Sequence, residues 1–178
     1  MKNFPGTNKP KNHLSGKQFL DGMFNGTSGL VMSQIKEFTD LTTPAIQNWV
    51  NRGWVSRPVN KRYDENQVAR ILIINTLRSV MSLESVAKLL YYVNGVAGDE
   101  RDDIIYESEL YGYVCDIIFS DADDKTVDGV ILNVTDSFKE RRSGDKARLT
   151  AALKIVYLSC KAIKYVNRSA RLLSEITG

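Results

Sequence analysis

Apolar positions recur at the three-to-four-residue spacing of amphipathic helices through most of the chain. Residues 1–16, which are rich in Lys, Asn, Pro and Gly, lack this pattern and are predicted to be disordered. The next residues contain two i,i+4 apolar pairs, Phe19 with Met23 and Leu20 with Phe24. We therefore expect residues 1–29 to be a tail with one short amphipathic turn that docks on the core.

Two short helices are predicted next, over residues 33–38 and 43–52. Ser33 is the expected N-cap of the first helix, and Thr42 caps the second. Gly53 lies where a glycine usually ends a helix. The second helix has an apolar face formed by Ile46, Trp49 and Val50, and a polar face formed by Gln47, Asn48 and Asn51. This arrangement suits a helix-turn-helix, in which the first helix braces the second and the second is free to enter a groove.

Residues 55–63 predict a tight basic hairpin, because a proline and an asparagine interrupt a run that carries Arg57, Lys61 and Arg62. Asp64 and Ser82 are predicted to cap the two helices that follow. The apolar positions of these helices are expected in the core: Val68, Ile71, Leu72, Ile74 to Leu77, Leu83, Val86, Leu89 and Leu90.

Residues 94–98 are the clearest boundary in the sequence, and three helices are predicted beyond it, over about 100–120, 124–140 and 145–175. The last of these carries an apolar seam at a four-three spacing: Leu149, Leu153, Val156, Cys160, Ile163, Asn167 and Ala170. Such a seam is either a coiled-coil stripe or the side of a single helix that faces the domain core.

The net charge of +3 is unevenly distributed. Residues 95–140 contain three Lys/Arg and thirteen Asp/Glu, a balance of −10, whereas residues 141–178 contain nine and two, a balance of +7. This asymmetry indicates either a nucleic-acid-binding part beside an acidic part, or acidic and basic helices that lie against each other.

The composition argues against an enzyme, a cofactor and a metal site. The chain has two cysteines, both in apolar helical patterns, and one histidine, in a polar segment. It therefore lacks a Cys/His cluster for zinc and a histidine-based nucleophilic triad. No apolar run reaches the roughly 18 residues of a membrane span, and no apolar signal core is visible near Met1. We expect a cytoplasmic protein that does not enter a membrane.

Residues 41–90 resemble the DNA-binding domain of MerR-type regulators in three ordered segments. TTPAIQNWVNRGWV, from Thr42, is similar to the family's recognition helix and the glycine that ends it. KRYDENQVARI, from Lys61, resembles the end of the wing and the capped third helix. LRSVMSLESVAKLL, from Leu77, matches the family's Leu-Arg, Ser-Leu-Glu and Leu-Leu positions.

The whole chain also resembles a family of uncharacterised Gram-positive bacterial proteins related to YkrK, in which a MerR-like helix-turn-helix precedes a helical region. Together these resemblances imply a mainly α protein. A winged helix-turn-helix with a minimal β-hairpin wing would occupy residues 30–94. A dimerisation or sensing region of about three helices would occupy residues 95–178.

Three departures from the MerR pattern limit what the resemblance implies. An Arg and a Tyr usually stand where this chain has Gln47 and Asn48, so the recognition helix carries less positive charge. Gln and Asn can still donate to phosphate or pair with adenine. The wing is shorter than usual and resembles excisionase-type variants. The C-terminal region does not begin with the long dimerisation helix of typical MerR proteins, so their promoter-untwisting mechanism is not implied.

The function predicted is a DNA-binding transcriptional regulator that binds double-stranded DNA as a homodimer formed by its C-terminal helices. The predicted DNA contacts are Thr43, Gln47, Asn48, Asn51, Arg57, Lys61 and Arg62, of which the last three would neutralise phosphates. Trp49 and Tyr63 are expected to anchor the core. Arg52, in the last turn of its helix, either contacts DNA or offsets the helix dipole. The alternative function is a protein-interaction module that binds a basic partner through its acidic helices and does not bind DNA.

Overall fold

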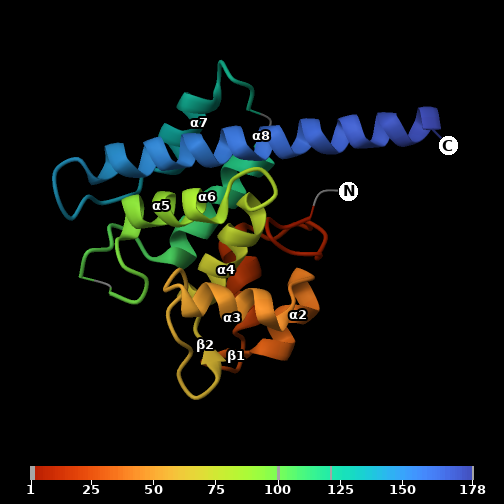
Figure 1. Cartoon of the computed structure of the whole chain (residues 1–178). Coiled ribbons are helices and arrows are strands. Elements are labelled where there is room, and N and C mark those ends of the chain that lie inside the picture. Colours follow the sequence, from red (N-terminus) through yellow and green to blue (C-terminus); the bar gives the residue numbers. More distant parts are fainter. Residues whose placement is uncertain (1–2, 100, 121, 178) are drawn as a thin grey trace.

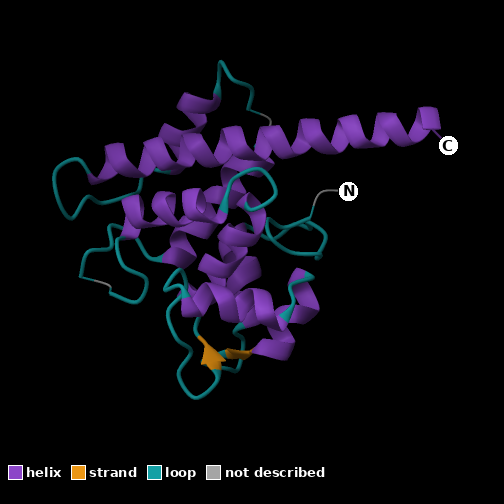
Figure 2. Cartoon of the chain, viewed as in Figure 1, coloured by secondary structure: helices purple, strands orange, loops and turns teal. Residues whose placement is uncertain are grey.

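The computed structural model describes residues 3–99, 101–120 and 122–177. Helices dominate this part of the chain, and two short strands form a small antiparallel sheet at one end of the molecule (Figures 1 and 2). The elements in chain order are α1 Gly16–Met23, β1 Leu30–Val31, α2 Met32–Thr39, α3 Thr43–Asn51, β2 Arg62–Tyr63, α4 Glu65–Leu77, α5 Leu83–Asn94, α6 Glu107–Phe119, α7 Val127–Val134 and α8 Asp145–Thr177. The prediction of a mainly α protein is confirmed.

Helix starts agree with the predicted caps at three of four positions. The side chains of Thr42, Asp64 and Ser82 each accept a hydrogen bond from a backbone N–H in the first turn of α3, α4 and α5. Ser33 is not a cap, because α2 already begins at Met32. The side chain of Gln34 takes part in the N-terminal cap instead, since its Oε1 accepts a hydrogen bond from the backbone N–H of Val31 at 2.9 Å.

The predicted β-hairpin wing differs from the structure in its strand pairing. Strand β2 pairs antiparallel with β1, which precedes α2, so that Tyr63 lies opposite Leu30. Within residues 55–63 the pairing is a single bridge between Val59 and Arg62. The tight turn is present as predicted, but its outgoing strand is held by a distant segment of the chain.

The prediction that residues 1–16 are disordered is wrong for the described residues 3–15, while residues 1 and 2 lie outside the description. Phe4 is buried, and its ring stacks on the ring of Phe19 at a centroid distance of 3.8 Å. The backbone N–H of Asn8 donates to the carbonyl of Phe38 at 2.9 Å. Phe4 therefore packs the segment against α1, and the hydrogen bond of Asn8 joins it to α2. The two apolar pairs of residues 19–24 fall in α1 and its C-cap, and α1 buries Leu20.

Helix α4 is the centre of the core, because every side chain from Gln67 to Ile74 is buried. Helices α1, α2, α5, α6 and α8 all pack against it. The division of the chain at residues 94–98 stays a prediction about domains, but helices from both sides of it share one hydrophobic core.

The three C-terminal helices predicted from the sequence are present as α6, α7 and α8. Residue 100, the expected start of the first, lies outside the description, and α6 begins at Glu107. The first half of the seam on α8 faces the core, since Leu149, Leu153 and Val156 are buried. This seam is therefore not a free coiled-coil stripe over that half. In the part of the chain that is described, no helix is both long and apolar enough to cross a lipid bilayer.

Candidate nucleic-acid interface

Helix α3 presents its polar side chains to solvent, as predicted. Gln47, Asn48 and Asn51 are exposed, and Thr43 is half-buried in the first turn. On the opposite side of α3, Ile46 and Trp49 are 0% and 2% exposed, so this face anchors the helix in the core. The three exposed side chains, called here the α3 polar face, are fixed in direction by that burial.

Residues 56–62, called here the basic turn, follow α3 and carry Arg57, Lys61 and Arg62. Asn60 and Lys61 have φ values of 49° and 63°, and the backbone N–H of Arg62 donates to the carbonyl of Val59 at 2.9 Å. Two successive residues in the left-handed region are typical of the tight turns that reverse a chain between strands. The turn is therefore a defined backbone structure.

The base of the basic turn is tied to α4 through Gln67, a buried amide. Its Nε2 donates to the carbonyls of Ser56 and Arg57 at 3.1 and 3.0 Å and to the hydroxyl of Ser56 at 2.9 Å. Arg57 and Lys61 are exposed, and neither forms an ion pair with any residue that the structure describes. Both cations are thus exposed on an anchored turn, and no described carboxylate forms an ion pair with them.

Arg62 differs from the other two cations of the basic turn. Its Nη1 donates to the carbonyl of Gly29 at 2.9 Å, across the small sheet. A Cβ on Gly29 would lie 2.9 Å from the Cβ of Arg62, so the close approach of these segments favours glycine at that position. Although Arg62 is exposed, part of its hydrogen-bonding capacity already stabilises the fold.

Arg52 has a structural role that sequence analysis did not identify. Its Nη1 forms an ion pair with Glu84 of α5 at 3.3 Å, and its guanidinium lies 5.0 Å from the ring centre of Trp54. Its Nε also donates to Oδ1 of Asn48 at 3.3 Å, which leaves the amide N–H groups of Asn48 free to donate elsewhere. The partners lie 32 residues apart, so no local sequence pattern could have predicted this pair.

Trp49 and Tyr63 are core residues, as predicted, with exposed fractions of 2% and 3%. The carbonyl of Trp49 accepts hydrogen bonds from the backbone N–H groups of Trp54 and Val55 at 2.9 and 3.3 Å. Burial raises the pKa of the Tyr63 hydroxyl. These two residues therefore hold the α3 polar face and the basic turn in place and do not form the contact surface.

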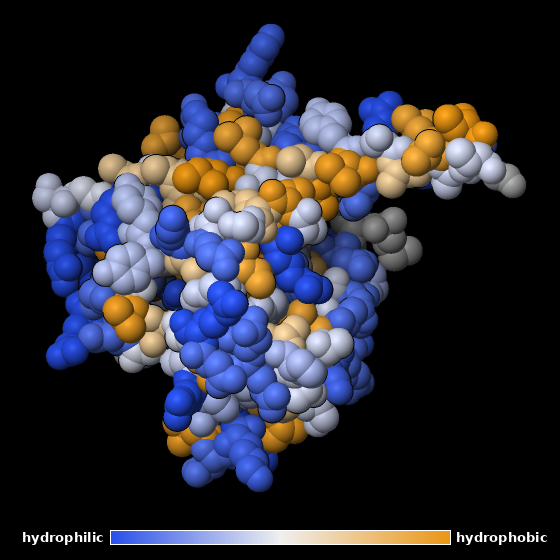
Figure 3. Space-filling model, viewed as in Figure 1, coloured by the Kyte–Doolittle hydropathy of each residue, from blue (hydrophilic) through white to orange (hydrophobic). Residues whose placement is uncertain are grey.

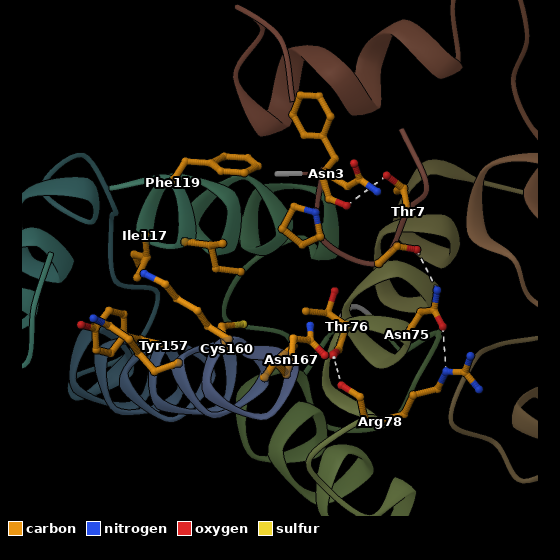
Figure 4. A pocket seen from close by; sticks show the side chains of 18 of the residues that line it. Asn3, Thr7, Asn75, Thr76, Arg78, Ile117, Phe119, Tyr157, Cys160 and Asn167 are labelled. Atoms are coloured by element: carbon orange, nitrogen blue, oxygen red, sulfur yellow. Dashed lines mark hydrogen bonds between the residues drawn. The ribbon is translucent and has the colours of Figure 1, made fainter. Parts of the chain in front are cut away.

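A second feature is a cavity of about 1110 Å³ under the second half of α8 (Figure 4). Cys160 and Asn167 of α8 lie on one side of it with Thr76 of α4 next to Asn167, and Phe119 of α6 lies on the other side. Burial raises the pKa of the Cys160 thiol to about 12, so this cysteine is a poor nucleophile at neutral pH. Among the described residues, no group of three or more His, Cys, Asp or Glu side chains could hold a metal ion.

Comparison with known proteins places the candidate interface inside a recognised sequence family. The chain is 31% identical over 94 residues to an "Uncharacterized protein YkrK" of Bacillus subtilis (strain 168). The matched segment covers 49% of this chain and 40% of that protein, so the chain spans well under half of the relative's length. No solved structure matches the chain. Residues 11–114, which include the α3 polar face and the basic turn, match the family described as "Domain of unknown function (DUF1836)". The chain therefore belongs to the DUF1836 family.

Proposed function

We propose that this protein is a DNA-binding transcriptional regulator that docks α3 and the basic turn on duplex DNA. The observation that carries the proposal is the α3 polar face beside Arg57 and Lys61, two unpaired cations on an anchored turn. The amides of the α3 polar face can donate to phosphates or pair with base edges in the major groove. The cations supply the attraction to phosphates that does not depend on sequence.

The arrangement of α2, α3 and the turn supports a winged helix-turn-helix of the MerR type. Helix α2 buries Ile35 and Phe38 and packs on α4, and the outer face of α3 is free. The basic turn takes the place of the wing, although its outgoing strand pairs with β1 and does not form a separate hairpin. A short turn of this kind can reach a phosphate backbone beside a helix in the groove.

The number of cations near α3 sets an upper limit on the electrostatic contribution to DNA binding. Arg52 is paired with Glu84 and Arg62 with Gly29, so Arg57 and Lys61 are the strongest candidates for phosphate contacts in each copy. Arg62 keeps its positive charge while it donates to the neutral carbonyl of Gly29, so each copy brings two or three cations. We therefore expect roughly four to six neutralised phosphates per dimer, which gives a log–log salt slope of about −4 to −5.

The second candidate function, an interaction module that uses an acidic surface, has less support. Several carboxylates of the acidic segment are engaged within the chain. Asp99 binds Arg101, Asp128 binds Lys154 of α8 at 2.8 Å, and Asp102 accepts a hydrogen bond from Val96 at 3.2 Å. Of these contacts, the pair between Asp128 and Lys154 joins the acidic segment 95–140 to the basic segment 141–178, which agrees with the interpretation in which acidic and basic segments of the same chain lie against each other.

The test is a selection of genomic DNA fragments by the purified protein at moderate salt, followed by fluorescence anisotropy of a selected fragment across a salt series. We expect Arg57→Ala/Lys61→Ala to abolish binding without changing the melting temperature, because exposed unpaired charges contribute little to folding. The matched control is Lys125→Ala/Lys139→Ala, which removes two exposed cations elsewhere and should bind normally. Failure to select any fragment, or equal binding by both double variants, would refute the proposed interface.

A further inference from the structure

Helix α8 has two different halves. Its first half crosses the molecule with Leu149, Leu153 and Val156 in the core, where it contacts α4, α5, α6 and α7. Its second half passes over the cavity and projects beyond the body at its C-terminal end (Figure 1). From Lys164 to Thr177 every side chain is exposed. An exposed helix would be expected to carry mostly polar side chains, but this half of α8 carries several large apolar ones.

The outer side of α8 carries a second apolar stripe, called here the outer stripe, at a regular spacing of three and four residues. Its members are Ile155, Leu158, Ala162, Tyr165, Ser169, Leu172 and Ile176. The five large side chains among them are 43%, 49%, 62%, 49% and 81% exposed, respectively. Val166 and Leu173, both 58% exposed, widen the outer stripe on one side. Apolar side chains accordingly gather along α8 and on its projecting end in Figure 3.

This stripe lies on the side of α8 opposite the core. At 100° per residue, the buried Val156 and the outer Leu172 point in directions roughly 160° apart around the helix axis. The body therefore cannot cover the outer stripe without a rotation that would expose the core face. A 3.5-residue apolar repeat over three heptads is the pattern of a helix that pairs with another helix. Its continuous exposed apolar surface indicates an unfilled interface.

We propose that the outer stripe binds the outer stripe of a second copy of this chain, with the two α8 helices antiparallel. The stripe is self-complementary in that orientation, because small and large side chains meet. Ala162 would lie opposite the partner's Leu172, and Ser169 opposite the partner's Tyr165. Leu158 would lie opposite the partner's Ile176. A parallel pair would instead place Ala162 against the partner's Ala162 and leave a gap in the core of the coiled coil.

Charge favours the same orientation. When Ala162 lies opposite the partner's Leu172, Lys161 lies next to the partner's Glu175. By symmetry this pair occurs twice, once on each side of the two-fold axis. Both pairs lie on the flank of the outer stripe opposite Val166. Among the described residues of the single chain, the ion pair of Glu175 is a long one, at 3.7 Å from Arg171. The register also places Arg168 near the partner's Arg168 at the axis, the one like-charge contact that it creates. A parallel pair has no opposite charges on facing flanks. The contact is isologous, so it closes as a dimer and does not propagate.

The proposal is independent of DNA binding, since α8 lies outside the residues that match the family and away from the α3 polar face. It replaces the dimer surface suggested by the seam that begins at Leu149, whose first half is in the core.

The first experiment measures mass in solution by sedimentation equilibrium from 1 to 100 µM protein. The full chain should have twice the mass of the single chain at the upper concentrations. Tyr165→Glu/Leu172→Glu should be monomeric with an unchanged melting transition at low concentration, because both side chains lie on the projecting half. The matched control, Ala170→Glu/Ser174→Glu, adds the same charge to another side of that half and should remain dimeric. A monomeric parent chain, or a dimeric Tyr165→Glu/Leu172→Glu, would overturn the proposal.

The second experiment tests the orientation by disulfide cross-linking in a Cys160→Ala background. Ala162→Cys/Leu172→Cys should give a cross-linked dimer on mild oxidation, because the two positions face each other across an antiparallel pair. Ala162→Cys alone and Leu172→Cys alone should not, since each position then lies about 15 Å along the axis from its equivalent in the partner. Efficient cross-linking by either single variant would show a parallel pair and overturn the proposed arrangement.

Discussion

Arg70 of α4 and Glu107 of α6 form an ion pair whose side chains are 6% and 7% exposed. The Nε of Arg70 also donates to the carbonyl of Trp54 at 2.6 Å, in the segment that follows α3. Glu107 Oε2 is buried and has no hydrogen-bond partner among the described residues. One buried guanidinium thus connects α6 to the segment that leads from the α3 polar face to the basic turn.

Glu107→Gln should destabilise the protein strongly, because it leaves the charge of Arg70 buried without a counter-ion. Breaking one side of a buried pair typically costs about 3–5 kcal/mol. Urea unfolding followed by circular dichroism would measure the change in the free energy of unfolding. The control is Glu84→Gln, which breaks the exposed pair with Arg52 and should cost less than about 1 kcal/mol. Similar losses from both variants would contradict the assigned burial of Glu107.

The N-terminal segment provides a second prediction. Phe4 is 1% exposed, stacks on Phe19, and meets the ring of Phe119 edge-on at 5.7 Å. Phe4→Ala should therefore lower the free energy of unfolding by about 3–5 kcal/mol, as for other buried aromatic residues. Tyr91→Ala, which removes an aromatic side chain that is 62% exposed, is the control and should have little effect. If Phe4→Ala is as stable as the parent chain, residues 3–10 do not belong to the core.

Local signals explain most of what the sequence predicted correctly. The caps at Thr42, Asp64 and Ser82 act within a single turn, so residue type and spacing suffice to place them. The burial of Ile46 and Trp49 beneath an exposed Gln47 follows from helical periodicity alone. For the same reason, the exposure of the predicted DNA-contacting side chains could be read from the pattern, whereas DNA binding itself stays a proposal.

Features that depend on distant residues could not be read from the sequence. Arg62 binds Gly29, and Phe4, in the segment predicted to be disordered, packs against α1 and α6. Helix α8 shows the difficulty most clearly, because it contains two apolar stripes, one through Leu149 and one through Leu172. Only the stripe through Leu149 was identified from the sequence, because the packing of α8 on the body is needed to show that the stripe through Leu172 is free.

A pair of glycines in α1 gives a third prediction. A Cβ on Gly16 would be closer than van der Waals contact to both Cβ and Sγ of Cys115 on α6. Gly16→Ala should therefore destabilise the protein by about 1–3 kcal/mol through overpacking. Gly22 lies in the same helix, and among the described residues nothing would lie within 4 Å of its added Cβ. Gly22→Ala should instead stabilise the protein by up to about 1 kcal/mol, through helix propensity.

Thermal unfolding of the two glycine variants beside the parent chain measures both effects. Opposite signs for the two substitutions are expected. If Gly16→Ala were as stable as Gly22→Ala, α1 and α6 could not be packed as closely as the structure shows.

The two cysteines predict how reactivity and stability change with pH. Burial raises the pKa of the Cys115 thiol and of the Cys160 thiol to about 12, whereas a free cysteine titrates near about 8.5. At pH 8 the thiolate fraction should thus be on the order of a thousandfold lower in the folded chain than in the unfolded chain. Alkylation by iodoacetamide, followed by mass spectrometry, should be very slow in buffer and fast in 8 M urea. Rapid modification of the folded chain at pH 8 would contradict the raised pKa of these two thiols.

The same shifts have a defined effect on stability. Because the folded chain holds these protons more tightly than the unfolded chain, the contribution of each thiol is fully present below about pH 8.5 and is lost as pH rises toward 12. Each thiol can account for a loss of at most about 1.4 kcal/mol per pH unit within that window. Urea unfolding at pH 8, 9 and 10 should show a decline, and Cys160→Ala should show a smaller one, because one of the two titrating groups is absent. Equal declines in the parent chain and in Cys160→Ala would show that the Cys160 thiol is not protected by folding.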